Sequence, residues 1–448
     1  MFRYLTSYRF YTLAKIGFGV AYLWYIWDFF RIHIAMWDQL SLLLSDPSDI
    51  TFSGNSQLDV YLRRAAIFVS GKTMVWVFFL ISPLAAGLYV WGRHKWLQFA
   101  VGCWMSFSMI SLTALVGVFT STADIWLNYI LITYSLTALI CPADEWEKCE
   151  SGFSVAGWRN NPVLASTFAW LVVLLQFSVY FFAGINKLID GWVPWTMGTA
   201  LQNLAFDSSM HEFVRGTHVP YWISLILCYV TLLQRLVVPF GFFFMRSRIW
   251  SVLILGAMHI GYAILMYVNL FPLVGIASLL MIWPPRILPL PQPSQPNRKK
   301  KIVPRNKQAT LVQSAAICLF SLWLLLESTR LTIADPMPWE NKLMAVPAWR
   351  MFADGGKWAG GKWRLIFETP QGEVDATDMA CQPLPHLWRN RFYIDTIFHE
   401  LLNKNTGPGS LADRLLQATE KTYRDRQLRM NGNPVVLDAG FDIIYRNP

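Results

Sequence analysis

About nine long stretches of this 448-residue chain contain few charged side chains. A helix needs roughly 20 mostly apolar residues to cross the hydrocarbon core of a bilayer, because every backbone polar group must be hydrogen-bonded there. The stretches therefore predict an all-α polytopic membrane domain of about nine transmembrane helices. They cover about residues 13–34, 73–91, 97–119, 124–141, 163–187, 221–245, 249–268, 270–284 and 310–330.

The composition agrees with a chain whose main partner is the lipid bilayer. Hydrophobic residues make up 54% of it and charged residues only 15%, against about 25% in soluble domains. Its 22 Trp and 30 Phe suit a bilayer and its interfaces. The net charge of +10 lies largely in short loops, so we interpret it as a topology signal rather than as a nucleic-acid-binding surface.

Basic residues also predict the orientation, since short cytoplasmic loops are rich in Lys and Arg. Nine crossings put four basic segments on one side, which predicts a multi-pass protein of the cell membrane with a cytoplasmic N-terminus. Arg63, Arg64 and Lys72 then lie outside, against the same rule. The four segments contain Arg3, Arg9 and Lys15; Arg93 and Lys95; Arg246 and Arg248; and the run "NRKKKIVPRNK" at residues 297–307.

The eighth stretch, "FPLVGIASLLMIW", is short. It could cross with help from neighbouring helices, or it could be re-entrant. At its start, in Asn269-Leu270-Phe271-Pro272, the proline is expected to break the helix and free backbone carbonyls. Broken helices at membrane depth often line cavities, and a simple kink is the alternative.

Residues 331–448 hold most of the polar sequence and are predicted to form a small extracytoplasmic α+β domain, with residues 1–330 as the membrane domain. Two strands are expected in "KWRLIFETPQGEVDAT" and a further hairpin in "NPVVLDAGFDIIY". Helical spacing marks "RFYIDTIFHELL" and "SLADRLLQATEKTYRDRQL". In the outer segment 189–220, "TALQNLAFDSSMHEFVRG" could form an amphipathic helix on the membrane surface.

Three ionisable residues in or at the ends of the apolar stretches are candidates for a functional role. Lys187 is either an interfacial anchor with its ammonium in water or a base that releases its proton easily. Gly184, one turn earlier, permits close approach of a helix or ligand. His259 is either bonded to a backbone carbonyl or turned toward a functional site. Arg235 needs a partner or a wet cavity, and Asp28 and Asp124 are candidates.

The chain contains no P-loop, Rossmann glycine pattern, HExxH or nucleophile elbow, and no metal site is evident. Three other segments carry a resemblance to a known family. "VYFFAGINKLIDGW" resembles the "AG-x-K-K-L…W" segment of vitamin K-dependent γ-glutamyl carboxylase and of the related bacterial membrane proteins called HTTM, for horizontally transferred transmembrane domain. "MHIGYAILMYVNLFPLVGIAS" is similar to the His-containing helix and "MFPYVMLAS" of the carboxylase. "AVPAWRMFADGGKW" resembles the "W-x-MF" segment of many HTTM proteins.

These motifs occur in the family's order, and the resemblance covers most of residues 1–330 and the start of the tail. It implies that Lys187 is a base that deprotonates a reduced quinone of the vitamin K type, with His259 near the same site. In the carboxylase, oxygen converts the quinol anion into a strong base that abstracts a glutamate γ-proton, and carbon dioxide then adds. The quinone-binding positions implied here are Gly184, Asn186, Trp192, Asn269, Phe271 and Pro272.

The sequence departs from the carboxylase at several positions. Asn186 replaces the first lysine of its motif, Asp124 stands where the carboxylase has a polar His, and Arg235 stands where an acidic residue is expected. The outer tail is also much smaller. We therefore expect a quinol-dependent enzyme, related to this lyase, that modifies a peptide or small molecule at the outer face. The alternative is a non-enzymatic membrane protein for export of, maturation of or immunity to a secreted peptide.

Overall fold

The computed structural model describes only part of the chain, and most of the described part is helix. Five helical segments have the length and apolar composition to cross a membrane, with spans of 18 to 23 residues. They confirm a mainly helical fold and fit an integral membrane protein. The described residues are 5–35, 72–92, 94–116, 122–140, 146, 163–165, 167–190, 192–205, 210–211, 213–214, 216–266, 268, 270–284, 307–334, 366–369 and 372–375.

The five spans belong to helices that the apolar stretches predict. Two of them contain a proline: Pro83 lies inside α4, and Pro239 lies in the 3₁₀ turn that continues α12. The helices are α4 (Lys72–Trp91), α6 (Thr122–Ile140), α9 (Thr167–Asp190), α12 (Tyr221–Leu236) with its continuation η2 (Val238–Phe243), and α13 (Arg248–Leu265).

Helices also occupy the other four predicted ranges, namely α1 (Tyr8–Ala35), α5 (Lys95–Val116), α14 (Phe271–Met281) and α15 (Lys307–Ala334). These four are not among the five candidate spans, so the count of nine crossings stays a prediction. At 1.5 Å per residue, the 11 residues of α14 reach only about 16 Å, about half of the hydrocarbon thickness. This short helix is nevertheless largely buried in protein.

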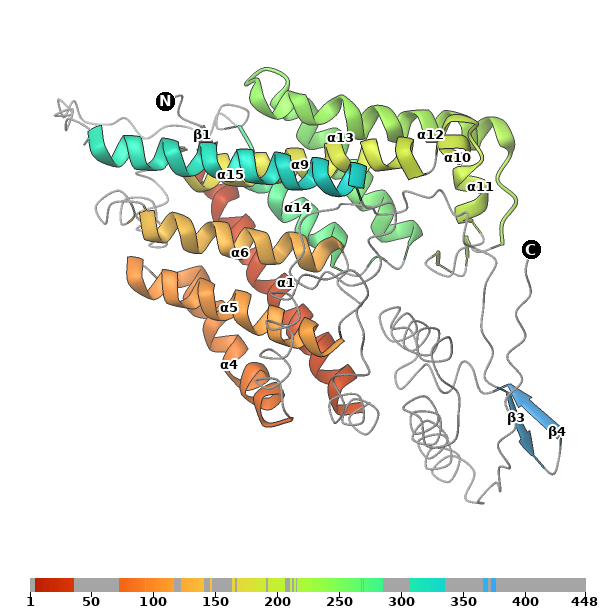
Figure 1. Ribbon diagram of the computed structural model, residues 1–448, viewed down its shortest axis with the longest axis horizontal. Coiled ribbons are helices and arrows are strands. Elements are labelled where there is room, and N and C mark those ends of the chain that lie inside the picture. Colours follow the sequence, from red (N-terminus) through yellow and green to blue (C-terminus); the bar gives the residue numbers. More distant parts are fainter. Residues whose placement is uncertain are drawn as a thin grey trace.

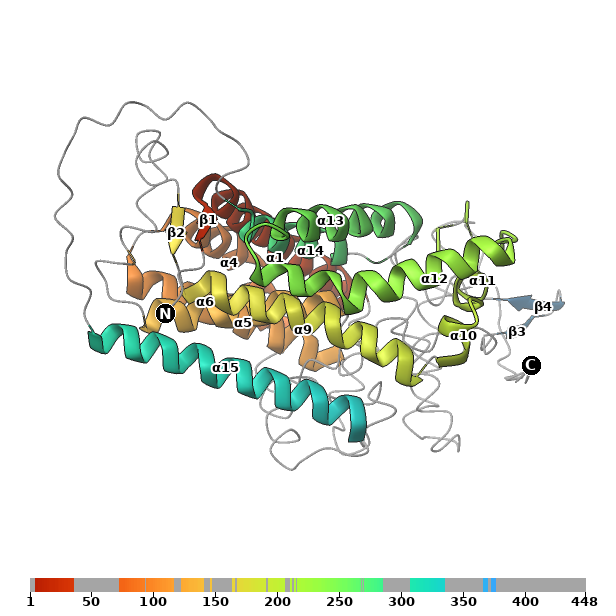
Figure 2. The ribbon, with the colours of Figure 1, turned by 90° about the horizontal axis from the view of Figure 1, so that it is seen from above.

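The helices pack into one bundle in which α9 and α14 have central places (Figures 1 and 2). Helix α1 packs against α4 and α14, and α5 packs against α4 and α6. Helix α9 contacts α6, α12, α14 and α15, while α13 contacts α14 and η2. Residues from both halves of the chain therefore meet around α9.

A short strand pair fixes the relative direction of two helices. Strand β1 (Leu5–Ser7), just before α1, pairs antiparallel with β2 (Val163–Ala165), just before α9. The starts of α1 and α9 therefore lie at one end of the bundle, and the short helices α10 (Trp192–Thr196) and α11 (Ala200–Leu204) lie at the other (Figures 1 and 2).

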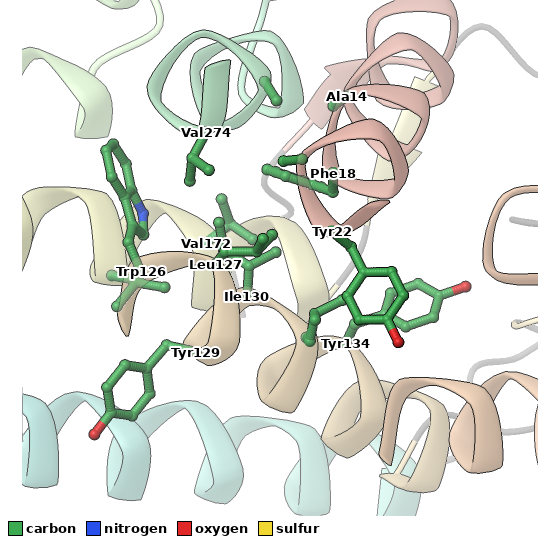
Figure 3. Close-up of a cluster of buried hydrophobic side chains, with 14 of the residues drawn as sticks. Ala14, Phe18, Tyr22, Trp126, Leu127, Tyr129, Ile130, Tyr134, Val172 and Val274 are labelled. Carbon is green, nitrogen blue, oxygen red and sulfur yellow. The ribbon is translucent and has the colours of Figure 1, made fainter. Parts of the chain in front are cut away.

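The core is aromatic and is assembled from helices distant in sequence. Figure 3 shows that side chains of α1, α6, α9 and α14 converge, while Tyr129 turns toward α15, where its ring lies 5.6 Å from that of Trp323. In this dense packing even one added carbon displaces its neighbours. The labelled converging residues are Ala14, Phe18, Tyr22, Trp126, Leu127, Ile130, Val172 and Val274.

Lys15, which the sequence analysis counts with the N-terminal basic segment, is buried in this core. Its side chain is 1% exposed, and its Nζ donates to Tyr134 Oη at 2.9 Å. Tyr134 donates in turn to Gln98 Oε1 at 2.7 Å, and Gln98 Nε2 donates to the Leu88 carbonyl at 2.6 Å. The buried ammonium is thus hydrogen-bonded into a chain that ends on the backbone.

The structure describes only a small part of the polar tail, residues 331–448. In the tail, β3 (Ile366–Thr369) and β4 (Gly372–Asp375) form an antiparallel pair in the segment for which the sequence predicts two strands. The other predicted hairpin and helices of the tail lie outside the described residues, so the α+β domain stays a prediction.

The amphipathic helix predicted from Thr199 onward is shorter than expected. Helix α11 ends at Leu204, and Ala200 and Leu204 are buried beside α12.

Candidate functional site

One face of α9 carries four residues that an apolar helix would otherwise not bury. Gln176, Tyr180, Gly184 and Lys187 follow one another at spacings of four, four and three residues, which aligns them along one side of the helix. The three side chains among them are at most 1% exposed. The interior of the bundle is therefore polar along this line.

His259 of α13 faces the line at Tyr180. The Tyr180 hydroxyl and His259 Nε2 lie 2.7 Å apart, and both side chains are fully buried. Aromatic rings surround the imidazole: the Phe271 ring centroid lies 4.8 Å away and that of Trp126 lies 6.0 Å away. The histidine is thus bonded to a phenol, and not to a backbone carbonyl, at its Nε2 atom.

The break between α13 and α14 makes room for the imidazole. Helix α13 ends at Leu265 and Met266 is extended, while Pro272 occupies the first turn of α14, where its missing N–H costs no helical hydrogen bond. A Cβ atom at Gly275 would overlap the His259 ring. The predicted helix break at Pro272 is confirmed, and Gly275 is the position where α14 admits His259.

Arg235 of α12 also belongs to this cluster. Its Nη2 donates to Tyr262 Oη at 3.0 Å, and its Cζ lies 5.7 Å from the Tyr180 ring centroid and 5.8 Å from that of Tyr262. A Cβ at Gly184 would lie 2.8 Å from Arg235 Cβ, so the glycine allows α9 and α12 to approach closely.

The structure gives Arg235 no ion pair among the described residues. Its Nε and Nη1 atoms are buried without a hydrogen-bond partner there. The two carboxylates that the sequence offers as partners, Asp28 and Asp124, are buried, and neither is without an interaction.

Lys187 lies farther along α9, with its Nζ 4.3 Å from the Trp195 ring centroid. It is 1% exposed, whereas an interfacial anchor keeps its ammonium in water. Trp195 packs with Ala200, Leu204, Cys228 and Leu232 from α11 and α12. Seven residues separate Lys187 from Tyr180, which is about 10 Å along the helix axis. Lys187 and His259, the two candidate catalytic residues, therefore belong to neighbouring clusters that α9 connects.

The other predicted positions divide into three groups. Phe271 and Pro272 are buried, and Phe271 lies beside His259. Asn186 is also buried, but as the residue next to Lys187 it projects about 100° away around the helix. Trp192 is 56% exposed, and Trp195 instead contacts Lys187. Asn269 lies outside the described residues.

Four residues of the two clusters were not predicted. Tyr180 and Tyr262 carried a usable signal, since they lie four residues before Gly184 and three after His259, on the same helix faces. Trp195 also follows Lys187 at a short distance in sequence. The sequence contains no such signal for Trp126, because this residue belongs to α6 and its ring meets Tyr180 and His259 only through tertiary packing.

In chemical terms the cluster offers a phenol, an imidazole, an indole and a guanidinium within aromatic walls. Within the described ranges no group of three or more His, Cys, Asp or Glu side chains could hold a metal ion. Comparison with known proteins adds no relative: no model of a protein family, no curated protein and no solved structure matches this chain.

Proposed function

We propose that this chain is an integral membrane enzyme that binds a reduced quinone beside Tyr180 and His259 and modifies a peptide or small molecule at the outer face. The observation that carries the proposal is the 2.7 Å hydrogen bond between Tyr180 and His259 inside a shell of aromatic rings. Small-molecule sites combine mostly apolar walls with a few polar groups, and a lipophilic ring suits such walls.

The polar atoms of the cluster fit a quinone. Within the described residues, Trp126 Nε1 and His259 Nδ1 are buried without hydrogen-bond partners, as are both amide atoms of Gln176 one turn from Tyr180. A quinol hydroxyl can donate to an imidazole nitrogen, and a quinone oxygen can accept from an indole N–H. When bound, the reduced quinone supplies the reducing electrons for chemistry with oxygen, and carbon dioxide is a further reactant if carboxylation is retained.

Roles for the protein's own residues follow from their positions. His259 accepts a proton at the imidazole, and Tyr180 orients the ring through Nε2. Lys187 is proposed as the base that receives the quinol proton after His259, so that quinol oxidation depends on both residues. It lies nearer the outer end of α9, where α10 and α11 cover it. The second substrate then approaches from that end.

We also propose that the N-terminus is cytoplasmic and that residues 331–448 are outside. The β1–β2 pair supports the parity of this topology, because the first and fifth of nine spans must start on one side. Protease added to intact cells should then remove the tail and leave the membrane domain. A tail that is protected in intact cells and cleaved only after lysis would contradict this orientation.

Binding of a quinol is testable by thermal unfolding of the purified full-length protein under anaerobic conditions. Menadiol at about 100 times its Kd should stabilise the protein by about 2.7 kcal/mol. Tyr180→Phe and His259→Ala remove hydrogen-bonding groups from the site, so each should reduce this stabilisation. Tyr221→Phe is the matched control, because Tyr221 is 53% exposed. The proposal fails if several quinols give no shift, or if the shift is equal in all variants.

A further inference from the structure

Arg235 is a buried cation in the middle of a span. It lies fourteen residues after the start and eight before the end of the segment Tyr221–Phe243, and its side chain is 0% exposed. Its Nε and Nη1 atoms carry three of the five guanidinium N–H donors, and within the described residues these atoms have no partner. A buried charge is strongly destabilising unless an opposite charge and hydrogen bonds compensate it.

Another buried cation of the bundle is hydrogen-bonded within the protein. Lys15 is equally buried, and its ammonium donates to Tyr134, which donates on to Gln98. Its Nζ is not among the buried atoms that lack a hydrogen-bond partner within the described residues, whereas Arg235 Nε and Nη1 are. Within the described part of the chain, Arg235 has one hydrogen-bond partner, Tyr262. Gly184 of α9 lies close to the stem of the same side chain. The difference between these two sites indicates that the remaining donors of Arg235 serve a ligand rather than the fold.

The neighbouring atoms favour a ligand that accepts hydrogen bonds. Trp126 Nε1, an obligate donor, is also buried without a partner among the described residues. Its ring lies 5.8 Å from that of Tyr180, and Tyr180 lies under the guanidinium. An oxyanion is an acceptor only, and the planar guanidinium fork binds two of its oxygens at once.

We propose that Arg235 binds a monoanionic oxyacid group, a carboxylate or a phosphodiester, beside the Tyr180–His259 pair. One guanidinium without an ion pair among the described residues matches one negative charge, and the neighbouring rings of Tyr180 and Tyr262 suit an acid attached to an apolar body. This inference rests on the proposed function, because the acid group is taken to belong to the second substrate or to a lipid bound at the same site. Arg235 is accordingly a binding residue.

Thermal unfolding of the full-length protein in uncharged detergent tests this with three probes: benzoate, diphenyl phosphate and phosphatidylglycerol. At least one should raise the Tm of the wild type, and Arg235→Met should weaken that probe's binding by about 10- to 100-fold. A response to benzoate or diphenyl phosphate identifies a small acid, and a response to phosphatidylglycerol alone identifies a lipid headgroup. Without any probe, Arg235→Met should unfold at a higher temperature than the wild type, because it removes a buried charge.

Arg248→Met is the matched control. Arg248 is also buried, and it lies at the start of α13. It does not take part in the observed hydrogen bond and ring contact of Tyr180 and His259. Its loss should leave the probe response unchanged. If Arg235→Met does not fold, Arg235→Lys makes the comparison, since it keeps the charge and loses the planar fork.

Absence of any probe response, or an equal response in Arg235→Met and the wild type, overturns the anion site. A lower Tm of folded Arg235→Met without probes also contradicts it, because it assigns Arg235 to the fold. Menadiol is measured in the same samples. A menadiol shift without an anion response rejects only the anion site, and an anion response without a menadiol shift rejects only the quinol proposal.

Discussion

Lys187→Arg is expected to lower quinol-dependent oxygen uptake by about 10²–10⁴-fold, as much as Lys187→Ala does. The reason is that a base must release its proton, which a guanidinium in a protein does not do. Both variants remove the base, but only alanine removes the positive charge beside Trp195. The measurement is oxygen consumption by purified protein with menadiol, after subtraction of the rate with heat-denatured protein.

Lys95→Arg provides the control for this substitution. Lys95 also lies over an indole ring, with its Nζ 5.2 Å from the Trp96 centroid, but it is at the start of α5 and outside both clusters. It should keep the wild-type rate. An active, normally folded Lys187→Arg beside an inactive Lys187→Ala would mean that Lys187 acts through its charge on Trp195, and the role of base would be abandoned.

Gly275→Ala should destabilise the protein by about 1–3 kcal/mol, the usual cost of overpacking a core, and remove its stabilisation by menadiol. The new methyl group would overlap the imidazole of His259, so the ring must move away from Tyr180 and from the rings of Trp126 and Phe271. Thermal unfolding with and without menadiol measures both effects.

Gly261→Ala is the matched substitution on α13, two residues from His259, where an added Cβ has no atom within 4 Å. Alanine is favoured over glycine in a helix by about 1 kcal/mol, so this variant should be as stable as the wild type or more so and should respond to menadiol. If Gly275→Ala matches Gly261→Ala in both stability and response, the position of His259 does not matter for quinol binding.

Much of the helical fold could be predicted, because a membrane span requires a long run of apolar residues whatever its neighbours are. Helices lie in all nine predicted ranges, and the break at Pro272 follows from the missing N–H of proline. The burial of Lys15 was not predictable in this way, since position in sequence does not reveal that Tyr134 accepts its hydrogen bond from another helix.

The candidate site was predictable only along single helices. Spacing aligned Gly184 with Lys187, but it could not bring Trp126 of α6 to His259 of α13 or separate Lys187 from His259 into two clusters. Trp192 was predicted and Trp195 was not, because the turn after α9 decides which indole is buried. Which faces of the helices meet is a property of the assembled bundle.

The claim that a quinol binds beside Tyr180 and His259 is tested most directly by photo-crosslinking. The purified protein is irradiated with an azido-naphthoquinone, with and without excess menaquinone, and the labelled residues are mapped by mass spectrometry. We predict labels on α9 near Tyr180 and on α13 and α14 near His259 and Phe271, all suppressed by menaquinone. Labels confined to exposed residues such as Leu233 and Trp250, and unaffected by menaquinone, would contradict the account.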